Sequence, residues 1–403
     1  MRWRFCVATS TDQSSTAKTG NVSLRTLIVV RSLKMGGMER VAVNLADAFA
    51  QEGHDSHLLS LSSVKEPLRP EEPGVSCHEL RLKHWARLTG VGFLLELVAR
   101  LILNPLLKRA LFLGTGIMGG VVFRLWLKRF EARHGRVDRL IFRGVGTFEL
   151  VWSFRDSRAC YVLENILQEG GPHWRRWLVG RCLYHQRHLV AVSNGVKDSV
   201  MQQLSAWETT PASLRVIVNP CPFASIHRQM LEDEPDLPTE PYIVTVARLV
   251  PAKDQALLLR AYARSGISEK VVLVGDGKER PRLESLADEL GIRERVVFAG
   301  QRSNPYPWMQ HARLFVLSSH FEGMGIVLFE ALACGTPVLS VDCPGGIREI
   351  LKGELESCVV PHSEEALAEG MRAAVKGPKP PVKSEWLDDF QPDRVVSRFL
   401  KPA

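Results

Sequence analysis

The stretch SHFEGMGIVLFEALACGTPVLS, residues 319–340, decides the fold of this chain. It begins as a glycine-bearing loop, continues as an apolar segment with helical spacing, and ends in a short apolar run with strand character. A carboxylate stands in the loop, Glu322, and a second, Glu330, just over one turn into the expected helix. Loop, helix and strand in this order form the repeating unit of a parallel sheet that is covered on both faces.

The same unit repeats outward from this stretch. In the C-terminal half, buried strands are expected at YIVTVA, KVVLVG, RVVFAG, RLFVLSS and PVLSVD, with helices between them at DQALLLRAYARSG, RPRLESLADELG and GIVLFEALACG. The N-terminal half repeats the alternation less cleanly, with strand candidates at LRTLIVV, SHLLSLS, DRLIFRG, ACYVLE and HLVAVS. The pattern predicts an α/β protein with doubly wound parallel sheets.

A chain of 403 residues exceeds what one hydrophobic core usually serves, which favours two domains. A proline-rich and acidic segment, 218–241, is typical of a connection between domains. We therefore expect two Rossmann-like domains facing each other across a cleft. The expected divisions are a disordered basic tail at 1–23, an N-terminal domain at 24–218, a C-terminal domain at 219–378, and a helix at 379–403 that returns to the first domain.

The first 23 residues and the cysteines indicate the cellular compartment and whether the protein binds a metal. The first 23 residues lack the apolar core of a secretory signal, so export is not expected. The eight cysteines form no CxxC pair and no cluster with histidine at metal-ligand spacing, which favours a reduced, cytosolic compartment and predicts no metal site.

The net charge of +8 is concentrated in one segment. Between Arg81 and Arg136 there are eleven Lys/Arg residues and two acidic ones, interleaved with apolar runs and tryptophans. The longest uncharged run, 110–123, is shorter than a bilayer span, so the segment is expected to lie at an anionic membrane surface, where each cation contributes about 1 kcal/mol. The alternative is a pair of ordinary core helices with a solvated basic face. Nucleic acid is not expected as a partner, because no nucleic-acid-binding module is visible.

Within this segment, GTGIMG at 114–119 matches the dinucleotide-binding pattern GxGxxG. That pattern requires a preceding strand and an acid about 20 residues later. The preceding NPLLKRALFL has helical rather than strand character, and Glu131 and Asp138 satisfy the spacing only loosely. We therefore do not expect a nicotinamide site here.

The loops that follow the C-terminal strands carry the candidate chemistry, because ligands of doubly wound sheets bind at the carboxyl ends of the strands. Two cations and several glycines stand there, and such loops, together with helix N-termini, favour a diphosphate. Glu322 would lie beside the group attached to the diphosphate and Glu330 would accept hydrogen bonds from a ribose diol. Taken singly, either glutamate could merely complement a helix dipole. The expected donor-binding residues are Arg248, Lys253, Gly275, Gly277, Gly323, Met324, Gly325, Ile326 and Glu330.

This constellation resembles the retaining GT-B glycosyltransferases of family 4, of the type that builds lipopolysaccharide and other bacterial surface polysaccharides. The E-x7-E element of that family appears as Glu322 and Glu330, its Arg/Lys pair as Arg248 and Lys253, and its VGxG turn as 274–277. ACGTPV, PGGIREIL, AVSNGVKDSV and VIVNP also resemble family segments. MGGMERVAVNLADAF resembles the family's N-terminal start, in which Gly36 and Gly37 would let the first loop approach the donor phosphates. The resemblance covers residues 24 to about 376.

The resemblance implies transfer of a sugar from a nucleotide-diphosphate donor, UDP- or GDP-linked, with retention at the anomeric carbon and without a metal or other cofactor. Arg248 and Lys253 would stabilise the charge that develops on the leaving diphosphate, and Glu322 would orient the sugar. No protein nucleophile is implied, because the leaving diphosphate itself helps to deprotonate the acceptor.

One departure from the family concerns a histidine near the acceptor. The corresponding region here reads ACYVLENILQEGGPHW, so Glu164 or Asn165 stands roughly where the histidine would be expected. Glu164 is the candidate catalytic replacement. His173 could instead reach in from the next loop, or Glu164 could merely cap its own loop.

The basic apolar segment 81–136 lies in the acceptor half, which suggests a lipid-linked or lipopolysaccharide-type glycan acceptor. The expected protein is cytoplasmic and peripherally associated with the inner face of the cytoplasmic membrane. A GT-B sugar phosphorylase, an epimerase and a non-catalytic membrane-associated scaffold of the same fold are the alternatives.

Overall fold

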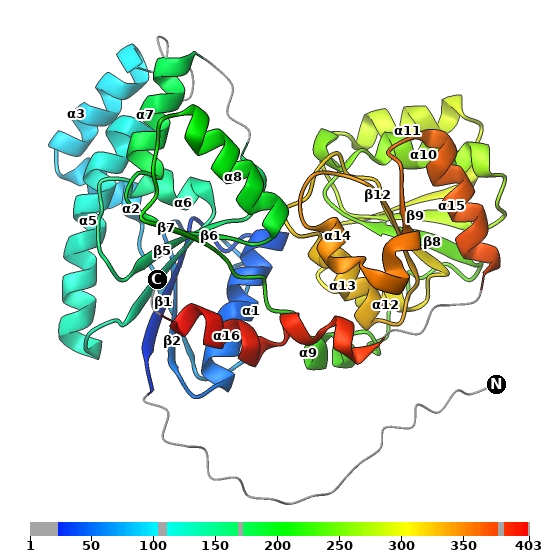
Figure 1. Ribbon diagram of the computed structural model, residues 1–403, viewed down its shortest axis with the longest axis horizontal. Helices are drawn as coiled ribbons and strands as arrows, with labels where there is room; N and C mark the ends of the chain where they lie inside the picture. The colour runs from blue at the N-terminus through cyan, green and yellow to red at the C-terminus, as the bar shows by residue number, and fades with distance from the viewer. Residues whose placement is uncertain (1–22, 104–110, 168–171, 378–382, 402–403) are drawn as a thin grey trace, which may run out of the picture.

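The computed structural model describes residues 23–103, 111–167, 172–377 and 383–401 (Figure 1). The expected tail at 1–23 therefore lies almost wholly outside the described residues. The strands form two all-parallel sheets, with strand orders β3-β2-β1-β4-β5-β6-β7 and β10-β9-β8-β11-β12-β13. Helices cover both faces of each sheet, as the alternation of strands and helices predicts.

The N-terminal sheet contains every strand expected there and two more. Its strands are β1 (Arg25–Val30), β2 (Asp55–Ser60), β3 (Val75–Glu79), β4 (Arg139–Arg143), β5 (Ala159–Leu163), β6 (His188–Ala191) and β7 (Ser213–Val216). Edge strands β3 and β7 were missed because neither contains a fully buried residue, so neither carries the apolar run of an interior strand. The helices are α1 (Gly37–Gln51), α2 (Leu82–Leu88), α3 (Val91–Val98), η1 (Ala99–Leu103), α5 (Leu111–His134), α6 (Val145–Leu150), α7 (His173–Leu183) and α8 (Asn194–Ala206).

The C-terminal sheet follows the predicted strands closely. It consists of β8 (Tyr242–Val246), β9 (Lys270–Val274), β10 (Val296–Gly300), β11 (Leu314–Leu317), β12 (Val338–Val341) and the two-residue edge strand β13 (Val359–Val360). The α-helices are α9 (Phe223–Gln229), α10 (Gln255–Ser265), α11 (Arg280–Glu289), α12 (Tyr306–Gln310), α13 (Ile326–Ala333), α14 (Ile347–Ile350) and α15 (Glu364–Lys376). Short turns of helix occur at η2 (Pro251–Lys253), η3 (Arg293–Arg295) and η4 (Gly353–Cys358).

Both sheets reverse their strand order at one point, between β1 and β4 in the first and between β8 and β11 in the second. At such a point the loops that follow the two neighbouring strands diverge to opposite faces and leave a crevice for a ligand. The loop after β8 carries Arg248 and Lys253, and the loop after β11 carries Glu322. The topology therefore brings these three residues to the position where ligands bind in doubly wound sheets.

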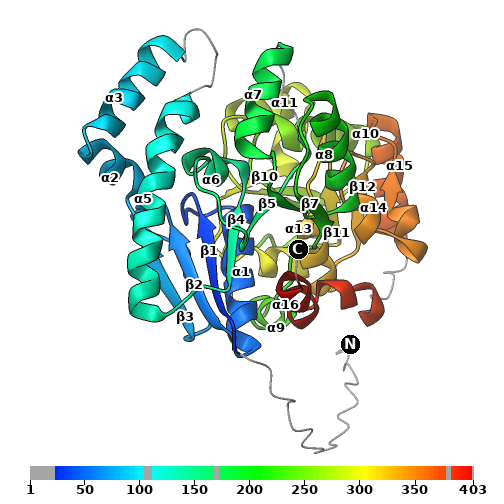
Figure 2. The ribbon, with the colours of Figure 1, turned by 60° about the vertical axis from the view of Figure 1, so that its left-hand side comes forward.

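The basic segment 81–136 forms α2, α3, η1 and α5 and lies at one side of the N-terminal domain (Figure 2). Residues 114–119, the GTGIMG match, lie inside α5, so they form no phosphate-binding turn. These glycines instead allow α5 to pack closely against neighbouring segments. A methyl group at Gly116 would collide with the Glu149 carbonyl oxygen and Trp152, and one at Gly120 with Ser153. Close approach of α5 to α6, and at Gly114 to Leu95 of α3, therefore explains this motif.

Helix α5 is long and apolar enough, by length and composition, to cross a membrane. Of its apolar 18-residue window, 39% is buried within the protein. Phe123, Leu127 and Phe130 on this helix belong to the main hydrophobic core. One face of α5 therefore behaves as an ordinary core helix, whereas α2 and α3 leave most of their apolar side chains exposed.

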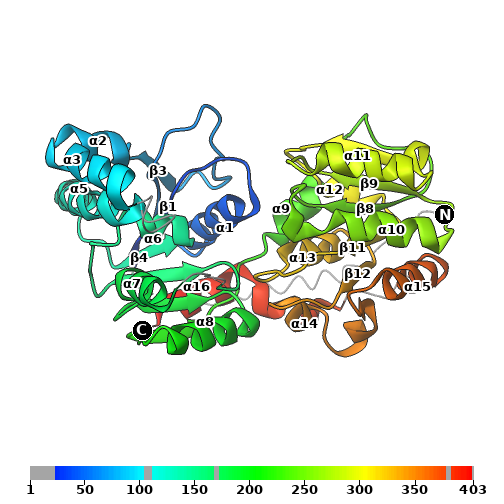
Figure 3. The ribbon, with the colours of Figure 1, turned by 90° about the horizontal axis from the view of Figure 1, so that it is seen from above.

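The end of the chain ties the two domains together. Short turns η5 (Ser384–Trp386) and η6 (Asp388–Phe390) lead into α16 (Pro392–Leu400), which packs against α1 of the N-terminal domain. Phe390 packs against Phe329 of α13 in a tilted arrangement, with ring centroids 3.8 Å apart, and Phe399 contacts Phe49 of α1. Figure 3 shows α16 with the N-terminal domain and α9 at the near edge of the C-terminal domain.

We expect Phe399→Ala to destabilise the protein by about 3–5 kcal/mol, because a buried aromatic ring would be replaced by a cavity between α16 and α1. Chemical denaturation followed by circular dichroism measures the change. Ser397→Ala, on the exposed face of the same helix, should stay within about 0.5 kcal/mol of the parent. Equal stability of the two variants would show that α16 adds little to the fold.

Candidate active site

An ion pair at the switch point of the C-terminal sheet forms the centre of the candidate site. Lys253, at the end of η2, places its Nζ 2.5 Å from Oε1 of Glu322. Ser319 donates its hydroxyl to the same carboxylate oxygen at 2.6 Å. Glu322 is only 7% exposed, so its charge requires these partners. The structure thus joins two of the residues that the sequence singled out.

Arg248 lies in the loop between β8 and η2, and its side chain is exposed. Within the described parts of the chain its guanidinium makes no ion pair, and Glu39 of α1 is the carboxylate that it influences electrostatically across the cleft. Burial raises the pKa of Glu39, Glu164 adds to that rise and Arg248 opposes it. Arg248 therefore remains available to an anionic ligand, with a carboxylate of the opposite domain nearby.

Gly275 and Gly277 follow β9, as expected, but a requirement of the fold accounts for both. A methyl group at Gly275 would collide with the Ala247 carbonyl oxygen, and one at Gly277 with that of Leu249. The Leu249 N–H donates to the Asp276 carbonyl at 3.0 Å, which fastens the two loops together. These glycines therefore support the loop that carries Arg248, whether or not their own N–H groups meet a ligand.

Glu330 lies on α13 at the far end of a chain of polar contacts that crosses the cleft. It accepts a hydrogen bond from the Tyr306 hydroxyl at 3.2 Å. Arg40 of α1 donates to that hydroxyl at 3.4 Å and to the Ser303 carbonyl at 2.7 Å. Burial raises the pKa of Glu330, while Arg40 and the Tyr306 hydrogen bond oppose the rise. The Glu330 carboxylate is surrounded by protein atoms, but the residue as a whole is only half-buried.

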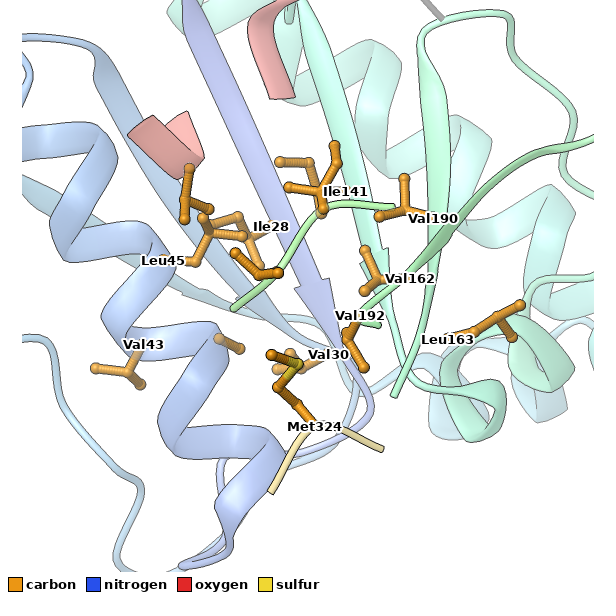
Figure 4. Packing of buried hydrophobic residues seen from close by; sticks show 14 of the residues in the cluster. Ile28, Val30, Val43, Leu45, Ile141, Val162, Leu163, Val190, Val192 and Met324 are labelled. Carbon is orange, nitrogen blue, oxygen red and sulfur yellow. The ribbon is translucent and has the colours of Figure 1, made fainter. Parts of the chain in front are cut away.

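The loop EGMG and the first turn of α13 lie between the two domains. Gly325 is in the left-handed region at φ 83° and begins α13, and a methyl group at Gly323 would collide with the Glu164 carbonyl oxygen. The Met324 side chain is buried against the N-terminal core beside Val30 and Val192 (Figure 4). Only the backbone of Met324 is therefore left for donor binding.

Gly36, Gly37 and Ile326 stand at the starts of two helices that face this region. Gly36 caps α1 in an extended conformation, and a side chain there would meet the Glu39 carboxylate at 2.5 Å. Gly37 has open space around its Cα. Ile326 opens α13; the Leu328 N–H of its first turn donates to the Gly325 carbonyl at 2.9 Å, whereas the N–H groups of Ile326 and Val327 come before any intrahelical acceptor. The start of α13 can therefore receive an anion, whereas the Glu39 carboxylate already lies at the start of α1.

A second contact between the domains lies beside the EGMG loop. Ser193 caps α8 by accepting from the Val196 N–H at 3.1 Å, and it donates to the Gly323 carbonyl at 2.7 Å. Glu349 of α14 accepts from the Asn194 amide at 2.9 Å and from the Gly195 N–H at 3.2 Å. These hydrogen bonds hold the PGG segment, residues 344–346, against the start of α8.

Glu164, the expected catalytic replacement for a histidine, is held in a buried polar network. Arg143, fully buried at the carboxyl end of β4, donates to it at 2.7 Å and to the Asn219 side-chain oxygen at 2.6 Å. The third guanidinium nitrogen of Arg143, Nη1, has no partner among the described residues. The network joins two strands of the first domain to the interdomain connection, which gives Glu164 a structural role as well.

The two alternatives to Glu164 do not reach the same position. Asn165 is exposed and uses its side-chain oxygen to accept from the Ile166 N–H at 3.1 Å. His173 begins α7 and lies 3.8 Å from Glu208, beyond the C-terminal end of α8. Since Ser193 at the opposite end of α8 meets the candidate site, His173 does not swing into it in this structure.

Sequence reasoning missed four side chains that the structure brings to the site: Glu39, Arg40, Arg143 and Tyr306. Glu39 and Arg40 lie within the MGGMER segment, in which only Gly36 and Gly37 were expected to contact the donor. Arg143 is the last residue of β4. A charged residue at the carboxyl end of a buried strand is a sequence signal for a ligand-site residue, and this signal could have identified Arg143. Tyr306 carried no signal, because only the fold brings α12 next to α13.

Comparisons with known sequences find similarity mainly in the C-terminal half of the chain. Residues 228–385 match the family model for glycosyl transferases group 1. The chain is 31% identical over 188 residues to an N-acetylgalactosaminyltransferase of Campylobacter jejuni that acts on a diphospho-undecaprenol substrate, covering 46% of this chain and 50% of that protein. It is 27% identical over 216 residues to the lipopolysaccharide 1,6-galactosyltransferase of Salmonella typhimurium, covering 49% and 57%. The chain thus spans about half the length of these relatives.

Comparisons of structure extend over nearly the whole chain. Sucrose-phosphate synthase of Thermosynechococcus elongatus superposes with a TM-score of 0.66 at 18% identity, covering 93% of this chain and 97% of that one. Anabaena HepE in complex with UDP and glucose superposes with a TM-score of 0.64 at 17% identity, covering 93% and 98%. The protein has the GT-B fold of two Rossmann-like domains, as the sequence predicts.

We expect Arg143→Met to destabilise the protein by about 3–5 kcal/mol, because it leaves the carboxylate of Glu164 buried without a cation. The double variant Arg143→Met with Glu164→Gln should recover much of that loss, since it removes both charges. Urea denaturation of the parent, both single variants and the double variant gives the coupling energy. Additive single effects would show that the two side chains do not form the interacting pair seen here.

Proposed function

We propose that this protein is a retaining glycosyltransferase that moves a sugar from a nucleotide-diphosphate donor to a lipid-linked or lipopolysaccharide-type glycan. The observation that carries the proposal is the arrangement at the switch point between β8 and β11. There, Arg248, Lys253 and the N-terminus of α13 offer positive charge beside two carboxylates, Glu322 and Glu330. The match of residues 228–385 to the glycosyl transferases group 1 model supports it.

The cations and the helix start suit the diphosphate. Arg248 is exposed toward the cleft and Lys253 is already oriented by Glu322, so both charges are in position before a donor binds. The N–H groups of Ile326 and Val327, at the start of α13, add donors that need no reorganisation. Fixed charges of this kind stabilise the negative charge that develops on the leaving diphosphate, and such stabilisation is usually the largest catalytic effect.

The two carboxylates would bind different parts of the donor. Glu330 has one oxygen occupied by the Tyr306 hydroxyl, which leaves acceptor capacity for a ribose diol. One oxygen of Glu322 is shared by Lys253 and Ser319, which leaves the other for a sugar hydroxyl. Arg40 touches Tyr306 from the opposite domain, so donor binding and domain closure would be coupled through this tyrosine.

Retention would require no nucleophile from the protein. The breaking bond joins the anomeric carbon to the diphosphate oxygen, and the acceptor hydroxyl attacks the same face while the departing diphosphate takes its proton. Glu164 and Glu39 are the carboxylates on the acceptor side that could orient the hydroxyl. No step of this account uses a metal ion or another cofactor.

The N-terminal domain, which would bind the acceptor, also carries a surface suited to anionic lipids. Helices α2, α3, η1, α5 and α7 expose Trp85, Leu88, Phe93, Leu94, Leu101, Ile102, Leu125, Trp174 and Trp177. Basic side chains lie among them, including Lys83, Arg87, Arg100, Arg124 and Lys128. So large an exposed apolar area is unfavourable in water, whereas a bilayer interface would bury it. We place the protein at the cytoplasmic face of the membrane, where lipid-linked glycans are within reach of the cleft.

The donor site is tested by isothermal titration with UDP, GDP, ADP and CMP and their sugar conjugates. One nucleoside diphosphate should bind, and Lys253→Met and Glu330→Gln should each weaken it at least about tenfold, the loss of one charged hydrogen bond. Lys376→Met, an exposed lysine at the end of α15, is the matched control and should bind as the parent does.

Product analysis then separates the alternatives. Transfer of the sugar to an undecaprenyl-diphosphate-linked glycan with an unchanged anomeric configuration supports the proposal. Release of a sugar phosphate with inorganic phosphate would indicate a phosphorylase, and conversion of the donor without an acceptor would indicate an epimerase. If no nucleotide binds, the transferase proposal is wrong, and the alternative of a non-catalytic scaffold with this fold is favoured.

Membrane association is tested by flotation with vesicles of phosphatidylethanolamine and phosphatidylglycerol. The variant Trp85→Ser with Phe93→Ser should partition at least about tenfold less, because two inserted aromatic side chains are lost. Leu231→Ser, which changes a still more exposed apolar residue after α9, should not change partitioning. Binding of the parent should also weaken as the salt concentration rises and strengthen as the fraction of anionic lipid rises. Equal flotation of all three proteins would refute the assignment of this surface.

A further inference from the structure

Three metal-ligating side chains meet at the carboxyl ends of three strands, beside the donor loops but outside them. Asp254 follows η2 after β8, His320 follows β11, and His362 follows β13. Their ligand atoms all lie within 4.8 Å of one another. None of the three belongs to the candidate active site described above, and sequence spacing gave no sign of the cluster because more than 100 residues separate its ends.

The distances between the ligand atoms suit coordination of a single small metal ion. The Oδ2 atom of Asp254 lies 3.4 Å from Nε2 of His320 and 3.5 Å from Nε2 of His362. A tetrahedral ion with ligand bonds of about 2.0–2.1 Å separates neighbouring ligand atoms by about 3.4 Å. The two imidazole rings stack at a centroid distance of 5.0 Å and an interplanar angle of 26°, and the Nε2 atom of each lies next to the same carboxylate oxygen.

The backbone and a helix cap hold the carboxylate in place. Asp254 is in the left-handed region at φ 42° and ψ 48°, which is uncommon for a residue with a side chain. Its Oδ1 accepts from the Leu257 N–H at 3.3 Å as the N-cap of α10, which leaves Oδ2 to face the histidines. A ligand oriented by a second hydrogen bond in this way is typical of metal sites.

We propose that Asp254, His320 and His362 bind one divalent transition-metal ion of the zinc class. Two imidazoles and one carboxylate are ligands that zinc, cobalt and nickel accept, and three protein ligands leave a fourth position for water. The side chains are 16%, 52% and 30% exposed, so an ion can enter from solvent. Asp254 and His320 also border a surface pocket, which supplies an entry path.

The position of the site gives the ion a structural role. Asp254 is adjacent to Lys253, and His320 lies two residues before Glu322, so the ion would join the two loops that carry the ion pair of the donor site. His362 adds the segment between β13 and α15 to the same point. The dipoles of α10 and α15 oppose a cation here, but dipole effects at exposed helix ends are small beside coordination by three ligands.

The test uses tag-free, metal-depleted full-length protein and Co²⁺ as the probe, followed by competition with Zn²⁺. One Co²⁺ should bind and give the visible absorption of a tetrahedral site without a thiolate band. Asp254→Asn keeps a good helix cap that tolerates the left-handed backbone while removing the charged ligand oxygen. That variant and the double variant His320→Gln with His362→Gln should each lose at least about tenfold in affinity.

His84→Gln, which removes an exposed histidine of α2, is the matched control and should bind Co²⁺ as the parent does. Zinc should also raise the thermal midpoint of the parent and of His84→Gln, and should not raise that of the two site variants. Absence of Co²⁺ binding, equal affinity in the site variants, or a thiolate-to-cobalt band would overturn the proposal. The readout requires no sugar donor, so its result is independent of the proposed transferase activity.

Discussion

The structure depends most on the close approach of the two domains where the EGMG loop meets the N-terminal sheet. Collisions with neighbouring backbone would follow from a side chain at Gly323, at Gly345 or at Gly195. Because all three positions are glycine, carbonyl oxygens and N–H groups of the two domains face each other directly, and Ser193 can reach the Gly323 carbonyl. This contact sets how far the loop bearing Glu322 stands from Glu164, and so fixes the width of the candidate site.

Around that contact, buried charges are arranged in pairs that connect the domains. Arg143 and Glu164 neutralise each other inside the N-terminal domain and bind Asn219 of the connection. Arg40 reaches across the cleft to Tyr306, which in turn binds Glu330. An unpaired charge at any of these positions would be costly, so the networks favour one relative placement of the domains. Residues that position a ligand and residues that position the domains are therefore largely the same.

The N-terminal domain combines two different surfaces. Its sheet and α1 face the cleft and are well packed, whereas α2 and α3 expose apolar side chains among basic ones. Helix α5 joins them, because its glycine-lined face packs on α6 while another of its faces is exposed. As a rigid connection, α5 would hold the cleft at a fixed distance from the partner surface that covers α2 and α3.

Local patterns in the amino-acid sequence predict the alternation of strands and helices, the two doubly wound domains, and the segments that carry Arg248, Lys253, Glu322 and Glu330. They do so because buried parallel strands are continuous apolar runs and because glycines and charges at strand ends are local signals. They do not predict the edge strands β3 and β7, which lack a buried apolar run, or the packing role of the glycines in α5. Nor do they reveal Arg40 beside Tyr306, Arg143 beside Glu164, or Asp254 beside His320 and His362. Those partners are far apart in the chain, and only the tertiary structure decides which of them share a low-dielectric space or a single ligand.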